Sequence, residues 1–175
     1  MANVGVWTDN WRGLKNAFLL GRYYEGLTTF RRYNGTSPSD GATVTSFAGP
    51  FANATTTVSA TSTTVLVGSS STPPAASDIT VTEINGMSYL TVANEGIEYD
   101  TSTGTATKTI KLTVQNQSNA DVTIREWGLF GGCNPSSANY GILLYREVLE
   151  NPVTLAVNQS ATLSVTLSIT LADPV

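Results

Sequence analysis

The chain has 175 residues, carries a formal net charge of −4 and is only 13% charged. A chain of this length can bury one substantial core, and a second independent domain is not expected. The acidic balance and the lack of clustered Lys and Arg argue against nucleic-acid binding. The sequence contains no long apolar run, so we expect no membrane-spanning segment.

The first predicted element is a short amphipathic helix within residues 4–21. Trp11, Leu14 and Phe18 recur at helical spacing on one side of it. Trp7 lies just before them. These four apolar side chains belong to a piece too short to fold alone, so we expect them to form an interface with another chain.

Residues 53–77 form a low-complexity tract of Thr, Ser, Ala, Val and Pro that carries no charge. β-Branched residues dominate it, whereas disordered tracts usually carry charge. We therefore expect an extended arm or linker between an N-terminal region of irregular strands, residues 1–52, and a body formed by residues 78–175. The low charge does little to oppose pairing between strand edges, so we also expect a homo-oligomer.

A β-hairpin is predicted at Asn85 and Gly86, because Asn-Gly takes the two positive-φ positions of a type I′ turn. The predicted register pairs residues 79–82 with residues 89–92. In this register apolar residues share one face of the hairpin, and Thr and Tyr share the other.

Further strands are predicted from apolar periodicity at residues 96–99, 108–115, 121–130, 141–149, 153–157 and 161–171. No helical pattern lies among them. The expected fold class is therefore all-β, an antiparallel β-sandwich of Ig-like or jelly-roll-like type.

Glu126 is the polar residue that the strand pattern singles out. The inward phase of Ile124 would continue at Glu126, yet the apolar residue is Trp127. A bulge near Arg125 resolves this conflict. We expect Glu126 to be buried, to accept backbone N–H groups or pair with Arg146, and we expect Trp127 to lie in the core or in an interface. A polar contact of Glu126 with a neighbouring subunit is the alternative.

Three consecutive patterns resemble a known family. A Glu-Trp-Gly-Leu-Phe strand at residues 126–130 is followed by Leu-Leu-Tyr-Arg at residues 143–146 and by strict apolar and hydroxyl alternation over residues 162–171. This run, roughly the last 70 residues, resembles the C-terminal β-sandwich of small tailed-bacteriophage structural proteins. The resemblance implies a virion protein that binds other virion proteins of the capsid, neck or tail. No signal peptide is visible at the N-terminus, so we expect synthesis in the host cytoplasm.

Within a virion, capsid decoration or a head fibre is the expected role of such a small, acidic, one-domain chain. A neck, tail or baseplate role is the alternative. A carbohydrate-binding or adhesive module is the alternative of another class, because Trp7, Trp11 and Trp127 could stack on sugars if they lay on an exposed face.

Side chains for catalysis and metal binding are scarce. The chain has no histidine and a single cysteine, Cys133, which removes His-dependent catalytic triads and the usual zinc and iron–sulfur ligands. Glu95, Glu98 and Asp100 are close in sequence and could serve a hydrolase or a calcium site, but their spacing favours solvated strand residues. We therefore expect no enzymatic activity, no cofactor and no metal.

Overall fold

The structure, a computed structural model, describes residues 4–13, 44–47, 52, 54–56, 62–135 and 140–170, without the side chains of residues 4, 44–47, 133–135 and 140. The described residues include a short helix, residues 9–13. The strands are β1 (Val4–Trp7), β2 (Val44–Phe47), β3 (Thr63–Gly68), β4 (Met87–Asp100), β5 (Thr105–Asn116), β6 (Val122–Pro135), β7 (Tyr140–Leu155) and β8 (Ser160–Thr170).

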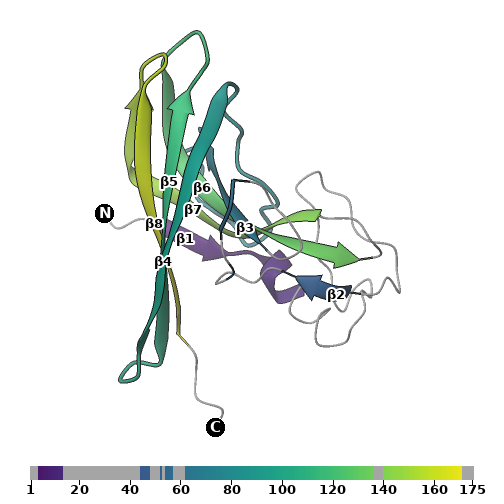
Figure 1. Cartoon of the computed structure of the whole chain (residues 1–175). Coiled ribbons are helices and arrows are strands. Elements are labelled where there is room, and N and C mark those ends of the chain that lie inside the picture. The colour runs from purple at the N-terminus through teal and green to yellow at the C-terminus, as the bar shows by residue number, and fades with distance from the viewer. Residues whose placement is uncertain are drawn as a thin grey trace.

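These strands form two antiparallel sheets that pack as a sandwich (Figure 1). In the five-stranded sheet, β1, β7 and β6 lie side by side, and β2 and β3 both pair with the other edge of β6. The three-stranded sheet has the order β4-β5-β8. The expected all-β antiparallel sandwich is confirmed.

The main core fills the space between the two sheets. Alternation along β5 turns Ile110, Leu112 and Val114 inward, and none of them has exposed surface. The same alternation along β8 buries Val165 and Leu167, while the Ser and Thr residues that alternate with the apolar residues of the strand face solvent. Each large apolar side chain buried in this way stabilises the fold by about 2 kcal/mol.

The five-stranded sheet is also covered on its opposite face. The chain between β3 and β4 crosses this face, and we call residues 69–82 the covering segment. Val81 of this segment packs with Phe130 and Leu143 in a second apolar cluster. Gly128 leaves room for this packing, because a Cβ atom there would lie 2.7 Å from a side-chain carbon of Leu143.

The C-terminal strands are longer than the sequence pattern predicts. Residues 141–149 and 153–157, expected as two strands, lie largely in the single strand β7, which ends at Leu155. β4 likewise continues through residues 96–99. Its pairing with β5 shifts register twice, as does the pairing of β6 with β7. These irregularities interrupt the apolar alternation without ending the strand.

The bulge predicted near Arg125 is confirmed. The pairing of β6 with β7 shifts between Ile124 and Glu126. Ile124 and Trp127 consequently both reach the main core, although strict alternation would put them on opposite faces. Glu126 faces the covering segment.

The turn predicted at Asn85 and Gly86 is present, but its type is not the predicted one. The Met87 N–H donates to the Ile84 carbonyl at 3.4 Å, and Gly86 has a φ of +79°. Asn85 does not have positive φ. A positive φ only at the second central residue is typical of a type II turn rather than type I′.

The predicted hairpin register is wrong. Residues 79–82 do not pair with β4, because Thr82 is held on the other sheet: its N–H donates to a Glu126 carboxylate oxygen at 2.8 Å. Glu83 then forms a bridge with Gly68 of β3, whereas β4 pairs with β5. The turn therefore carries the chain from one sheet of the sandwich to the other.

The arm predicted over residues 53–77 is not found in its described part. β3 pairs with β6 along its whole length, and Val65 and Val67 are buried in the main core. Thr63 and Thr64 are buried as well. An uncharged, β-branched segment is what a strand covered on both faces requires.

The helix predicted within residues 4–21 is replaced at its start by a strand. β1 pairs with β7, which is consistent with the β-branched Val4 and Val6, and the described helix is confined to residues 9–13. Leu14 and Phe18 lie outside the described residues.

Candidate functional site

A buried ion network holds the covering segment on the five-stranded sheet. Glu126 has no exposed surface, and its Oε1 atom accepts the backbone N–H groups of Ser70 and Thr82 at 3.1 and 2.8 Å. Its Oε2 atom accepts a hydrogen bond from Nε of Arg146 at 2.5 Å. The burial and the partners predicted for Glu126 are both found.

Arg146 extends this network to two further points of the covering segment. One terminal nitrogen lies 2.8 Å from a carboxylate oxygen of Asp78, and the other donates to the Thr72 carbonyl at 3.1 Å. Arg146 is only 4% exposed, so its charge depends on these partners rather than on water. The network therefore has a structural role, and Asp78, which the sequence pattern did not single out, belongs to it.

Trp7 and Trp11, predicted as interface residues, lie in an aromatic cluster. The ring centroid of Trp7 is 6.1 Å from that of Trp11 and 5.0 Å from that of Tyr145, whose ring lies 5.2 Å from Trp127. Trp127 is buried, and the half-buried Trp7 and Trp11 pack against the main core. Rings engaged with each other and with the core are unfavourable as a sugar-stacking platform. The contact of Trp7 and Trp11 with another chain stays a prediction.

Tyr145 is the centre of this cluster. Its hydroxyl donates to a Glu147 carboxylate oxygen at 2.9 Å. Burial, together with the nearby charge of Glu147, raises the pKa of Tyr145 well above its ordinary value of 10. Gly5 of β1 lies directly over the phenol, since a Cβ atom there would be 1.7 Å from the Tyr145 hydroxyl oxygen.

Thr8 fixes the end of β1 on β7. Its N–H donates to the Leu144 carbonyl at 2.9 Å, and its hydroxyl donates to the Leu143 carbonyl at 2.6 Å. The ladder between β6 and β7 shifts register at this point, between Leu129 and Phe130. Thr8 thus supplies donors to carbonyl groups beside an irregularity in the ladder. Only tertiary structure reveals this role, because β7 is distant in sequence.

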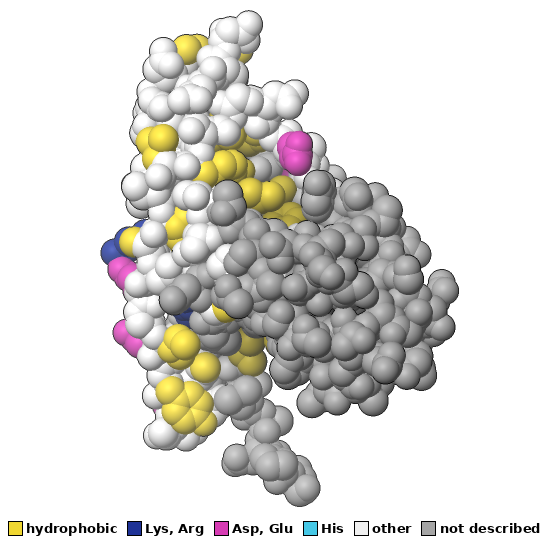
Figure 2. Space-filling view, turned by 45° about the vertical axis from the view of Figure 1, so that its right-hand side comes forward, with side chains coloured by type: hydrophobic (Ala, Val, Ile, Leu, Met, Phe, Trp, Pro, Cys, Tyr) yellow, Lys and Arg dark blue, Asp and Glu magenta, His cyan; other side chains and the backbone are white. Residues whose placement is uncertain are grey.

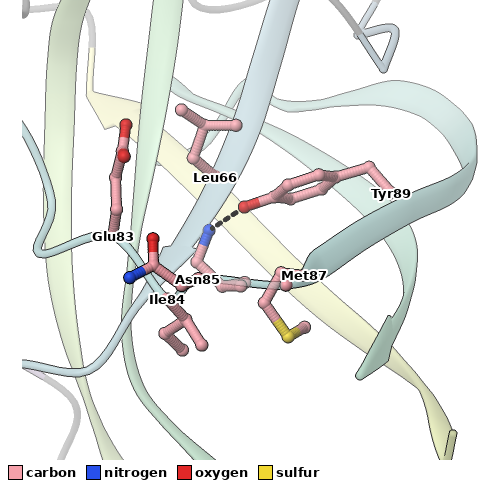
Figure 3. A pocket seen from close by; sticks show the side chains of 8 residues that line it. Leu66, Glu83, Ile84, Asn85, Met87 and Tyr89 are labelled. Carbon is pink, nitrogen blue, oxygen red and sulfur yellow. Dashed lines mark hydrogen bonds between the residues drawn. The ribbon is translucent and has the colours of Figure 1, made fainter. Parts of the chain in front are cut away.

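A cleft of about 280 Å³ lies beside the turn that joins the two sheets (Figure 3). Its lining consists of Leu66, Val67, Glu83, Ile84, Asn85, Gly86, Met87 and Tyr89. The Tyr89 hydroxyl accepts the Val67 N–H at 3.1 Å, and burial raises the pKa of Tyr89, so the phenol is protonated at neutral pH. The volume is just below the range of about 300–1,000 Å³ typical of small-molecule sites. Glu83 is the single carboxylate in this lining, so the cleft lacks the carboxylate pair of a glycosidase.

The carboxylates considered for a hydrolase are exposed on β4. Asp100 accepts hydrogen bonds from the hydroxyl and the N–H of Ser102 at 2.7 and 2.9 Å, which lower the pKa of Asp100. Glu95 pairs with Lys111. Glu95 and Glu98 line a hollow of about 140 Å³, and Asp100 is not part of its lining. Within the described part of the chain, no group of three or more His, Cys, Asp or Glu residues could hold a metal ion.

The outward face of the three-stranded sheet is lined with hydroxyl groups. Its strands β5 and β8 bring together the pairs Thr105–Thr170, Thr109–Thr166 and Thr113–Thr162, with Oγ1 atoms 3.2, 3.1 and 3.0 Å apart. Charged side chains of the described residues are few in the view of Figure 2. The β5–β8 part of the sheet presents hydroxyl groups, whereas β4 adds the exposed Glu95, which pairs with Lys111, and the exposed apolar side chains of Leu90, Ile97 and Tyr99.

No protein-family model, curated protein or solved structure matches the chain. Where the structure is described, no helix is long and apolar enough to cross a membrane. The buried ions and aromatic rings hold the fold together. The accessible chemistry of the described residues lies on the three-stranded sheet and in the cleft beside the Asn85–Gly86 turn.

Proposed function

We propose that this protein is a non-enzymatic structural protein of a bacteriophage virion that acts by self-association and by docking on the particle. The observation that carries the proposal is the three-stranded sheet, whose outward face is lined with hydroxyl groups and whose outer strands β4 and β8 pair, among the described residues, only with β5. Such a sheet offers backbone pairing to another chain and a polar contact surface.

The arrangement of the C-terminal strands supports the same proposal. The segments that resemble phage structural proteins are neighbours in one sandwich: residues 126–130 lie on β6 and residues 143–146 on β7, which pair directly. The alternating last segment forms the edge strand β8. The resemblance therefore concerns strands that build one β-sandwich. This sandwich is the part of the protein that we propose to lie on the surface of the particle.

We favour capsid decoration or a head fibre as the role, because the chain is small and acidic. The partners are then other copies of this chain and another virion protein on the head. A neck, tail or baseplate position is the alternative, in which the same surfaces contact a tail component.

Purified particles of the phage or prophage that carries the gene test this proposal. The particles are analysed by mass spectrometry and by immunogold electron microscopy with antibodies against the purified protein. A non-structural phage protein followed through the same density gradient controls for carry-over. We expect multiple copies per particle and gold label on the head. Label on the tail supports the alternative position, and absence of the protein from purified particles contradicts a virion role.

A further inference from the structure

The two edges of the three-stranded sheet are built differently. β4 carries Glu95, Glu98 and Asp100, and its pairing with β5 shifts register twice. Charges and bulges keep an edge strand from pairing with another chain. β8 has neither, because Ser160–Thr170 contains no charged residue and no proline and keeps one register with β5 along its full length. β8 is therefore the unprotected edge.

The backbone groups on the outer edge of β8 belong to its Ser and Thr residues. At the start of the pair with β5, the Asn116 N–H donates to the Gln159 carbonyl at 3.0 Å. Hydrogen-bonded pairs alternate along an antiparallel ladder, so the odd-numbered residues of β8 bond to β5 and the even-numbered residues direct their N–H and C=O groups outward. The short distance between the Thr109 and Thr166 hydroxyls agrees, because side chains approach most closely in the non-hydrogen-bonded pairs. Within the described chain no strand pairs with this edge.

The strand is also complementary to itself. If two copies run antiparallel with Val165 opposite its own equivalent, Leu163 faces Leu167 and Ser164 faces Thr166 of the other copy. Apolar residues then continue along the inward face across the join, and hydroxyl residues continue along the outward face. No like charges meet, because the strand carries none.

We infer that β8 is a homodimer edge, at which two copies of this chain pair antiparallel about a two-fold axis at Val165. The two three-stranded sheets become one continuous sheet, and the contact is isologous, so it closes without forming a fibre. This inference names the self-association surface of the proposed function and rests on that function for its role in a virion. The pairing itself is a property of the purified protein.

A charge-swap pair of variants tests the edge and its register. The variant Ser164→Glu/Thr166→Glu places carboxylates of the two copies opposite each other beside the two-fold axis. The matched control, Ser164→Glu/Thr166→Lys, places each introduced carboxylate opposite an introduced ammonium group. Within one chain Ser164 lies opposite Lys111 and Thr166 lies opposite Thr109, so neither variant places like charges directly opposite each other across β5 and β8.

Sedimentation equilibrium of the full-length proteins measures the outcome, and circular dichroism checks that each variant folds. We expect a wild-type dimer, a dissociation constant raised by at least about tenfold in Ser164→Glu/Thr166→Glu, and a value within about threefold of wild type in the control. A monomeric wild type overturns the inference. A dissociation constant of Ser164→Glu/Thr166→Glu equal to that of the wild type overturns it as well. If the control dimer dissociates as readily as the dimer of the first variant, the register centred on Val165 is wrong.

Amide hydrogen exchange of the wild-type protein provides a second measurement that needs no substitution. Dimerisation protects the even-numbered amides from Thr162 to Ser168, whereas the odd-numbered amides are protected by β5 in the monomer as well. Protection of the even-numbered amides that rises with protein concentration supports the inference, and its absence overturns it. A dimer in solution together with absence from virions contradicts the proposed function alone, whereas a monomeric virion protein contradicts the dimer edge alone.

Discussion

Nε of Arg146 lies 2.5 Å from a carboxylate oxygen of Glu126, between neighbouring strands and beneath the covering segment. The same guanidinium reaches Asp78 within that segment at 2.8 Å. One arginine therefore ties the five-stranded sheet to the chain that covers it. Removal of one partner from such a buried network leaves the remaining charge incompletely compensated.

Glu126→Gln should lower the free energy of unfolding by about 3 kcal/mol, because Arg146 loses a carboxylate in a site with little access to water. Urea denaturation measures this loss. Glu95→Gln is the matched control, since it removes a carboxylate that is 45% exposed and pairs with Lys111 at the surface. The control should change stability by less than about 1 kcal/mol. Equal losses in the two variants would contradict the role assigned to the buried network.

Gly86→Ala should destabilise the protein by about 2 kcal/mol or more, because it forces a side chain into positive φ. The new Cβ atom would also lie 2.9 Å from the backbone of Ser118. Gly96→Ala on β4 is the control, since its Cβ atom would meet nothing within 4 Å. Thermal unfolding compares the two variants, and an unchanged melting temperature for Gly86→Ala would rule out the type II turn.

Thr8→Val should cost about 1–2 kcal/mol, because it removes the hydroxyl that donates to the Leu143 carbonyl on β7. Hydrogen exchange should then quicken at the amides of β1. Thr8→Ser retains the hydroxyl and should preserve most of the protection. If Thr8→Ser loses as much protection as Thr8→Val, the hydroxyl is not what holds β1 on β7.

Alkaline pH should destabilise the wild-type protein more than Tyr145→Phe. Burial raises the pKa of Tyr145 in the folded protein, so above about pH 10 the unfolded chain releases a proton that the folded chain retains. The free energy of unfolding therefore falls as the pH rises through this range. Denaturation of both proteins at about pH 9 and about pH 11 gives the loss of the free energy of unfolding in each. The larger loss in the wild type reports the Tyr145 phenol, since other groups titrate alike in both proteins. Identical losses in the two proteins would contradict a buried phenol.

Local patterns predicted much of the three-stranded sheet and the Glu126 site. Alternation marked the inward residues of β5 and β8 because each of these strands has one buried and one solvated face. The conflict of phase between Ile124 and Trp127 located the bulge and singled out Glu126, with backbone N–H groups or Arg146 as its expected partners. This conflict of phase is visible within a few neighbouring residues.

The rest of the fold depends on tertiary contacts that periodicity does not show. β3 is covered on both faces, so its Thr-rich sequence has no alternation to identify it as a core strand. The chemistry of Asn85 and Gly86 specifies a turn, but the partners of the flanking segments are set by Glu126 and β5. Trp7 predicts an apolar contact without indicating that its partner is Tyr145.

The most direct test of an assembling virion protein is an electron cryo-microscopy map of the particle at a resolution that separates β-strands. We predict density for this sandwich on the head, with β8 of one copy paired antiparallel to β8 of a second copy. A map in which the sandwich is absent would contradict the virion role. A map in which β8 faces solvent in every copy would contradict assembly through this edge.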